Sequence, residues 1–138
     1  MSIIASEEPT VRMLRDVPLD MLEAFQPRLT PDQFRRSRHV VTEIARVSEG
    51  HAALLAGDLE MFGTLMNRSY FSARSDYGSS SPALDGMWLA ATGHPACYGA
   101  RYSGGGEAGA IVALVAADGV DEFITSAPAD YRAQTGRE

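Results

Sequence analysis

Residues 98–115 read Tyr-Gly-Ala-Arg-Tyr-Ser-Gly-Gly-Gly-Glu-Ala-Gly-Ala-Ile-Val-Ala-Leu-Val, and this stretch holds the clearest local pattern of the chain. Two strand-like segments, Tyr98–Ser103 and Ala110–Val115, flank a loop. Glycine is common where a backbone turns with positive φ or approaches a partner closely. Four glycines lie in this loop: Gly104, Gly105, Gly106 and Gly109. The pattern predicts either a tight hairpin or a loop that binds a ligand.

The loop has a structural and a functional interpretation. A strand–glycine–strand passage is most often a hairpin connection with a bulge. Successive backbone N–H groups of a glycine loop can also converge on an anion such as phosphate. The loop does not match a Walker A motif, since no Lys-Ser or Lys-Thr follows, and no helix pattern opens after Gly109 as in a dinucleotide fingerprint. Glu107 opposes phosphate further, because two anions a few Å apart repel by about 1 kcal/mol or more.

Size and composition limit the classes of function. The 138 residues fit one domain with a core of its own. The chain is 45% hydrophobic and 22% charged with a net charge of -6, so it offers no broad basic surface to nucleic acid. The single Cys97 excludes an intramolecular disulfide and a Cys-based zinc site and is typical of a reducing cytoplasm. Without a signal-peptide pattern or an apolar run near the roughly 18 residues of a membrane span, we expect a cytoplasmic protein without membrane partners.

The N-terminal part shows weak patterns. Residues 1–10 predict a frayed or loosely attached leader, and the domain is expected over residues 11–138. A short strand or an extended entry follows from Val11 and ends at Pro18. Asp16 or Pro18 then starts a short helix that Pro27 closes.

A long helix is predicted from Pro31 to Ala56. Thr30 is its expected N-cap, Gln33 completes a capping box, and Gly57 is the expected C-cap. Residues three and four apart mark its apolar face: Phe34, Ser37, Val41, Ile44, Ser48, Ala52 and Leu55. Charged residues predict that its other faces are solvated, with ion pairs of little energetic value: Arg35, Arg36, Arg38, His39, Glu43, Arg46 and Glu49.

The remaining elements complete an α+β arrangement. Asp58 caps a second helix that runs to about Arg74 and forms an antiparallel hairpin with the first, and residues 75–80 are expected as a loop. Ser81-Pro82 opens a third helix that ends at Gly93. After the two strands, a last helix pattern over residues 119–136 contains Pro128, which should kink or split it. We expect a small antiparallel sheet that helices cover on one side.

No catalytic set follows from the spacing of reactive residues. His39 and His51 share one helix but are too far apart for a metal-ligand pair, and His94 lies in a loop before Pro95. Ser79, Ser80 and Ser81 lack the context of a nucleophile elbow. The candidate acids have no local partner: Asp76, Asp85 and Glu107.

Spaced motifs nevertheless follow one another between roughly Leu14 and Gly136. They are Arg38–Val47 (Arg-His-Val-Val-Thr-Glu-Ile-Ala-Arg-Val), Ala56-Gly57-Asp58-Leu59, Phe62-Gly63-x-Leu65-Met66-Asn67-x-Ser69, Asp76-Tyr77, Ser81-Pro82-x-Leu84-Asp85 and Gly99-Ala100-Arg101 before the glycine loop. Together they resemble the C-terminal half of galactokinases. These enzymes belong to the GHMP superfamily of galactokinase, homoserine kinase, mevalonate kinase and phosphomevalonate kinase.

The resemblance implies half of a two-domain small-molecule kinase. In such enzymes the N-terminal domain supplies the main ATP-phosphate loop, the catalytic acid and most sugar contacts. The C-terminal domain supplies a ferredoxin-like α+β layer and a glycine-rich loop on the same cleft. ATP and Mg2+ belong to the whole enzyme, so no catalytic residue, metal ligand or cofactor is expected in this chain alone. The residues implied at the nucleotide or substrate cleft are Arg101, Ser103, Gly104, Gly105, Gly106, Glu107 and Gly109.

The chain departs from the family pattern inside the loop. Tyr102-Ser103 replaces Met-Thr, and Glu107-Ala108-Gly109 replaces Phe-Gly-Gly. Ala108 adds a β-carbon and Glu107 a negative charge, and both changes should weaken phosphate binding. Galactokinases also continue into a last strand that is not found here, so we expect an unpaired sheet edge that must be covered or paired with another copy.

Three hypotheses follow from the resemblance. The first is a galactokinase-like C-terminal domain, encoded as a separate or truncated chain and inactive by itself as a sugar 1-kinase. The second is a split enzyme, in which another polypeptide supplies the N-terminal half. The third is a non-catalytic binding or self-associating module, for instance a homodimer through the open sheet edge.

Overall fold

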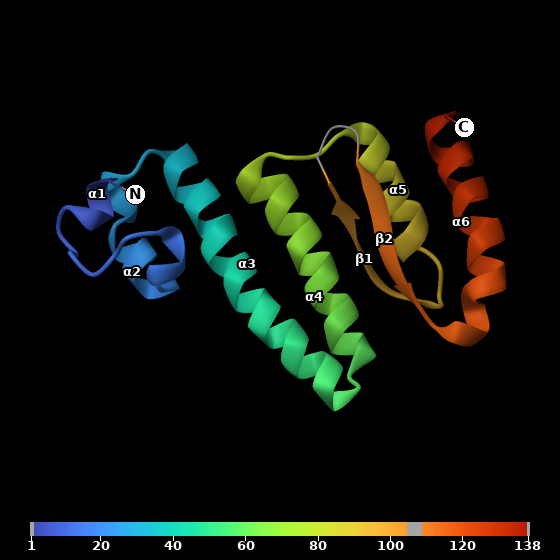
Figure 1. The fold of residues 1–138 in the computed structure, drawn as a ribbon. Helices are drawn as coiled ribbons and strands as arrows, with labels where there is room; N and C mark the ends of the chain where they lie inside the picture. Colours follow the sequence, from blue (N-terminus) through green and yellow to red (C-terminus); the bar gives the residue numbers. More distant parts are fainter. Residues whose placement is uncertain (1, 105–108, 138) are drawn as a thin grey trace.

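The computed structural model describes residues 2–104 and 109–137. Its helices and strands are α1 (Ser2–Ala5), α2 (Leu19–Ala24), α3 (Pro31–Ala56), α4 (Leu59–Ser72), α5 (Pro82–Thr92), β1 (Cys97–Ser103), β2 (Ala110–Val115) and α6 (Val120–Thr135). Helices α3 and α4 lie side by side, the sheet follows α4, and α1 and α6 lie at opposite ends of the molecule (Figure 1). This α+β arrangement of a helical hairpin and a small antiparallel sheet confirms the expected fold class.

The ends of α3 agree with the prediction. The Thr30 hydroxyl accepts a hydrogen bond from the backbone N–H of Gln33 at 3.2 Å, and the Gln33 side chain accepts one from the backbone N–H of Thr30 at 3.0 Å. Gly57 ends the helix in the left-handed region at φ 71°, which glycine adopts without a steric penalty. These caps fix the length of the longest helix in the part of the chain that the structure describes.

Helix α4 begins as expected and ends differently. The Asp58 carboxylate accepts a hydrogen bond from the backbone N–H of Met61 at 2.9 Å, so the two-residue connection folds α3 and α4 into a hairpin. Beyond Ser72 the chain continues into one π-helical turn, Ala73–Tyr77, so helical structure extends past Arg74 into the segment that the sequence predicts as a loop. Gly78, at φ 76°, ends that turn. Asp76, which lies in this π turn, contacts Arg38 of α3 and Ser72 of α4, as described below.

The two strands pair antiparallel, which confirms the predicted hairpin. Arg101 lies opposite Val112, and Ser103 lies opposite Ala110. Tyr102 is buried in a cluster with the α5 residues Leu84 and Trp88, while Arg101 and Ser103 alternate with it and are exposed. One face of the sheet is therefore covered and the other face is open.

The outer edge of β1 is closed by side chains. The Asn67 side chain of α4 accepts a hydrogen bond from the backbone N–H of Ala100 at 3.0 Å. The Trp88 indole of α5 donates one to the carbonyl of Ala100 at 3.0 Å. Trp88 also stacks on Tyr70, with ring centroids 4.4 Å apart. Both backbone groups of Ala100 are thus satisfied without a neighbouring strand.

Helix α4 and strand β1 touch through two glycines. A β-carbon on Gly63 would lie 2.3 Å from the carbonyl oxygen of Tyr98, and one on Gly99 would lie 2.0 Å from the carbonyl oxygen of Gly63. No real β-carbon tolerates such distances, so this close approach requires glycine on both sides. The contact places the start of β1, and with it Arg101, against α4.

The N-terminal segment is packed, contrary to the loose leader expected over residues 1–10. Ile4 is only 2% exposed, and Glu7 forms an ion pair with Arg28. Between Val11 and Val17 the chain forms no strand but contains a short 3-10 turn, Leu14–Asp16. These parts share one small core: Ile4, Val11, Val17, Leu22, Phe25 and Val41. The apolar residues of this segment follow no helical or strand periodicity, but they pack against the first turns of α3.

The last helix runs through its proline. Helix α6 is continuous from Val120 to Thr135, so of the two expectations, a kink or a split at Pro128, the split is wrong. A proline removes one backbone donor, but the other hydrogen bonds and the packing of α6 can hold the helix. Such packing is visible at Gly86 of α5, where a β-carbon would lie 2.6 Å from the Thr135 methyl group.

Candidate functional site

The buried face of α3 differs from the predicted one. Ile44 and Leu55 were expected in the core but are 42% and 77% exposed. Val41, Gly50 and Ala53 are the buried residues of this helix. The face turned toward α4 therefore also carries polar residues that the sequence places on a solvated surface: His39, Glu43 and Arg46.

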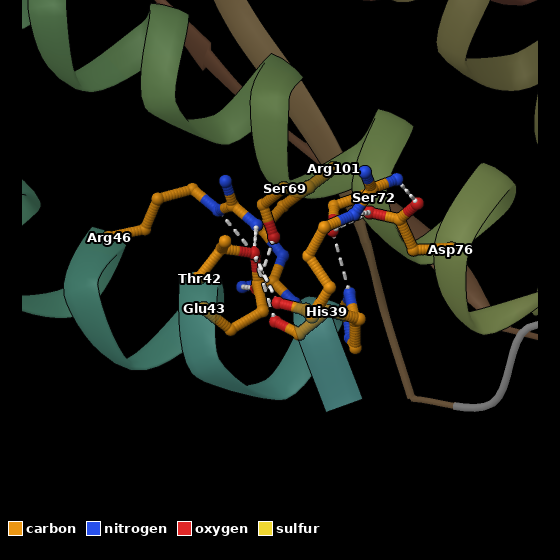
Figure 2. A network of polar contacts seen from close by, with 9 residues as sticks. His39, Thr42, Glu43, Arg46, Ser69, Ser72, Asp76 and Arg101 are labelled. Carbon is orange, nitrogen blue, oxygen red and sulfur yellow. Dashed lines mark hydrogen bonds and ion pairs between the residues drawn. The ribbon is translucent and has the colours of Figure 1, made fainter. Parts of the chain in front are cut away.

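Glu43 is the centre of a polar cluster between α3 and α4 (Figure 2). Its carboxylate accepts a hydrogen bond from the Ser69 hydroxyl of α4 at 2.6 Å and one from Arg46 Nε at 2.5 Å. Arg46 also donates to the Thr42 hydroxyl at 2.7 Å. The side chains of Glu43 and Arg46 are only 22% and 16% exposed, so this pair is far more enclosed than an ordinary surface ion pair.

A second group of contacts extends the cluster toward the π turn. His39 Nδ1 and the Ser72 hydroxyl are hydrogen bonded at 3.0 Å. The Ser72 hydroxyl in turn donates to Asp76 at 3.2 Å. Asp76 also forms an ion pair with Arg38 of α3. The interface between α3 and α4 is thus polar from Arg38 to Arg46 of α3.

The cluster sets the charges of its members. Burial raises the pKa of Glu43, but the hydrogen bonds from Ser69 and Arg46 outweigh this effect and hold the pKa below its usual value. Burial lowers the pKa of His39, with the Glu43 charge acting against that effect. At neutral pH, Glu43 is therefore ionised and His39 is a neutral ring.

Arg101 connects this cluster to the glycine loop. Its guanidinium Nη1 lies 3.9 Å from the Glu43 carboxylate, and the side chain is 48% exposed. A hollow of about 320 Å³ between α3 and α4 is lined by Arg101 together with Glu43 and Ser69. A second hollow of about 430 Å³ on the open face of the sheet is lined by Arg101, Ser103 and Gly104. Arg101 thus lies where the two hollows meet.

The structure describes part of the predicted site. Arg101 and Ser103 project from the open face of β1, and Gly104 has φ 82°, a conformation that favours glycine. Gly109 lines a different hollow, on the α5 and α6 side of the sheet. Gly105, Gly106 and Glu107 lie outside the described residues. Within the described part, the predicted residues Arg101, Ser103 and Gly104 lie together beside the polar cluster.

The other candidate residues take part in contacts that hold the fold together. Asp85 accepts hydrogen bonds from Tyr70 and Ser80 and pairs with Arg74, which ties the start of α5 to α4. His94 is buried and its ring lies edge-on to Phe123. In residues 2–104 and 109–137, no group of three or more His, Cys, Asp or Glu side chains could hold a metal ion. None of the helices in these two stretches could span a membrane.

The sequence did contain a signal for the polar cluster. In a helical hairpin, residues at similar distances from the Gly57–Asp58 connection lie near each other, to within about one helical turn. His39, Glu43 and Arg46 repeat at helical spacing on α3, and they face Ser69 and Ser72 on α4. The pattern thus indicates that polar residues of the two helices lie near each other, but it does not give the pairs that form.

Comparison with known proteins agrees with this fold. The family model described as GHMP kinases C terminal matches residues 51–132. A galactokinase of Roseiflexus sp. (strain RS-1) is 43% identical over 94% of this chain, and the match covers 33% of that protein. The galactokinase of Homo sapiens is 46% identical over 75% of this chain and 26% of its own length. The chain thus spans about a third of the length of the curated relatives it matches.

A solved structure extends the likeness to three dimensions. The structure named "Crystal Structure of Lactococcus lactis Galactokinase Complexed with Galactose" matches with a TM-score of 0.89 and 28% sequence identity. The match covers 98% of this chain and 35% of that one. Because the family model covers more than half of the chain and the fold agrees, the chain belongs to the GHMP kinase C-terminal family.

Proposed function

We propose that this chain forms one wall of the active-site cleft of a galactose-phosphorylating kinase and acts together with an N-terminal kinase half. The observation that carries the proposal is the position of Arg101, between two hollows and three residues before Gly104. Fixed cations that face phosphate oxygens stabilise phosphoryl transfer, and a guanidinium binds phosphate well. The N-terminal half belongs either to the same polypeptide or to a separate one.

The net charge of the polar cluster favours the binding of an anionic substrate group. Glu43 carries one negative charge and faces two guanidinium groups, those of Arg46 and Arg101. The nearby Asp76 is paired with Arg38. Among these five described groups, one positive charge is left over, which suits a phosphate better than a neutral ligand.

We propose further that the chain alone does not phosphorylate galactose. ATP and Mg2+ would be held mainly by the N-terminal half, which in the family also supplies the catalytic acid. Ser103 and Gly104 would complete the cleft from this side. We place the assembled enzyme in the cytoplasm, as the single Cys97 suggests.

A fusion protein tests this proposal. The N-terminal two thirds of the Roseiflexus galactokinase, the part that this chain does not match, is joined to this chain at the start of the matched region. We expect ADP release that requires both ATP and galactose from the fusion, and none from the chain alone. The complete Roseiflexus enzyme is the positive control.

Two results would overturn the proposal. One is a fusion that melts cooperatively but releases no ADP when both substrates are present. The other is galactose phosphorylation by the purified chain without any N-terminal half. In the fusion, Arg101→Lys should lower kcat/KM by about tenfold or more, because a lysine cannot reproduce the forked geometry of a guanidinium.

A second candidate function is self-association. The described residues provide no strand partner for the outer edge of β2, and a hollow of about 570 Å³ lies between α5, β2 and α6. Its lining includes Ile124, which is 62% exposed. Such an edge can pair with a second copy of the chain.

A further inference from the structure

The backbone of Arg101 is held firmly, whereas its long side chain is less constrained. Its backbone lies in the strand register opposite Val112, and the glycine contact holds β1 against α4. The side chain, by contrast, is about half exposed and long enough to adopt many rotamers. Within residues 2–104 and 109–137, Glu43 supplies the carboxylate that lies within 4 Å of this guanidinium.

Glu43 is itself held in place by two helices. One carboxylate oxygen, Oε1, accepts from Arg46 on α3, and the other, Oε2, accepts from Ser69 on α4. Oε2 is also the oxygen nearest Arg101. Arg46 is fixed in turn by its hydrogen bond to Thr42. The Glu43 carboxylate is therefore held in one position by these contacts (Figure 2), and it lines the same hollow as Arg101.

We infer that Glu43 is a positioning residue, which holds the Arg101 guanidinium at the junction of the two hollows so that it faces the substrate phosphate. The inference rests on the proposed function for its catalytic part. A half-exposed ion pair at 3.9 Å adds little to stability. A misplaced catalytic group, however, can lower a rate by up to about 100-fold. By orienting Arg101, Glu43 can thus affect the reaction rate more than its ion pair with Arg101 affects stability.

The first test uses the chain as it is and needs no activity. The 15N-labelled chain gives an NMR signal for the Nε–Hε group of Arg101, which the Arg101→Lys variant identifies by its loss. We expect Glu43→Gln to shift and broaden this signal. Asp76→Asn is the matched control, because it removes a carboxylate from the same α3–α4 interface but one that contacts Arg38 and Ser72. An unchanged Arg101 signal in Glu43→Gln would overturn the inference.

The second test is a double-variant cycle in the fusion enzyme. Glu43→Gln should lower kcat/KM by about tenfold. Asp32→Asn, which removes an exposed carboxylate paired with Arg35 at the start of α3, should change it less than about twofold. If Glu43 acts through Arg101, adding Glu43→Gln to Arg101→Lys should cause almost no further loss. Two losses that multiply would show that Glu43 acts elsewhere, for instance only on helix packing, and would overturn the inference.

The two tests separate this inference from the proposed function. A well-folded fusion without activity refutes the proposed function and with it the catalytic role of Glu43. The NMR experiment then still decides whether Glu43 orients Arg101. An active fusion with an unperturbed Arg101 signal in Glu43→Gln refutes the inference and leaves the proposed function intact.

Discussion

Glu43 links the stability of the domain to pH. Its pKa in the folded chain lies below the usual 4.5, so it contributes stability above the unfolded pKa. That contribution is lost as the pH falls through the folded pKa, because the unfolded chain binds the proton more readily. We expect the free energy of unfolding to fall between about pH 5 and pH 3, and to fall less in Glu43→Gln. Urea unfolding of both proteins at several pH values measures the difference. Parallel curves would contradict this prediction.

Gly63 should tolerate no side chain. In Gly63→Ala the new β-carbon would meet the Tyr98 backbone, which cannot move without shifting β1, so we expect a loss of about 3 kcal/mol. Gly50→Ala is the control, because its β-carbon would lie 3.3 Å from the movable Phe62 ring. We expect that control to change stability by about 1 kcal/mol or less. Thermal melts of both variants test the prediction, and equal losses would contradict it.

At the level of single residues, the resemblance named three described residues that lie close together. Arg101, Ser103 and Gly104 line one hollow on the open face of the sheet, and Arg101 also lines the hollow between α3 and α4. Their role at a cleft stays a prediction. Glu43 was assigned to solvent because a charged residue on a helix is usually exposed. Its burial depends on a partner, Ser69 of α4, that lies 26 residues further along the chain. Helical periodicity of one element cannot reveal such a pairing.

At the level of elements, local chemistry predicted the boundaries well. The Thr30 cap, the Ser81-Pro82 start of α5 and the two strands all agree with the structure, because caps and turns are determined by nearby residues. The N-terminal segment and the π turn were missed. Both depend on contacts with other elements, namely the packing of Ile4 in the N-terminal core and the ion pair between Asp76 and Arg38.

Pro128 should weaken α6. A proline inside a helix removes one hydrogen bond, so Pro128→Ala should raise stability by about 1 kcal/mol or more. Pro82→Ala is the matched control, because Pro82 is the first residue of α5, where proline fits, and no gain is expected. Differential scanning calorimetry compares the two melting temperatures. A lower melting temperature for Pro128→Ala would contradict this prediction. It would mean that packing of the proline ring in the apolar hollow stabilises the fold by more than the missing hydrogen bond costs.

At the level of the whole molecule, the open edge of β2 predicts self-association. If a second copy pairs there, sedimentation equilibrium should show a dimer whose fraction rises with concentration. Ile124→Glu places a charge in the hollow beside β2 and should abolish the dimer. Leu89→Glu is the control, since Leu89 is 55% exposed on α5 and does not line that hollow. A monomer at all concentrations would remove the basis for the second candidate function.

The two edges of the sheet differ in one further respect. At the outer edge of β1, Asn67 accepts the Ala100 N–H and Trp88 donates to its carbonyl, and Ala100 is fully buried. An edge amide usually exchanges its hydrogen with solvent quickly, but this one opens only when α4 separates from the strand. In deuterium oxide the Ala100 amide should therefore be among the last to be replaced, and its exchange rate reports directly on how firmly the helical hairpin holds the strand that carries Arg101.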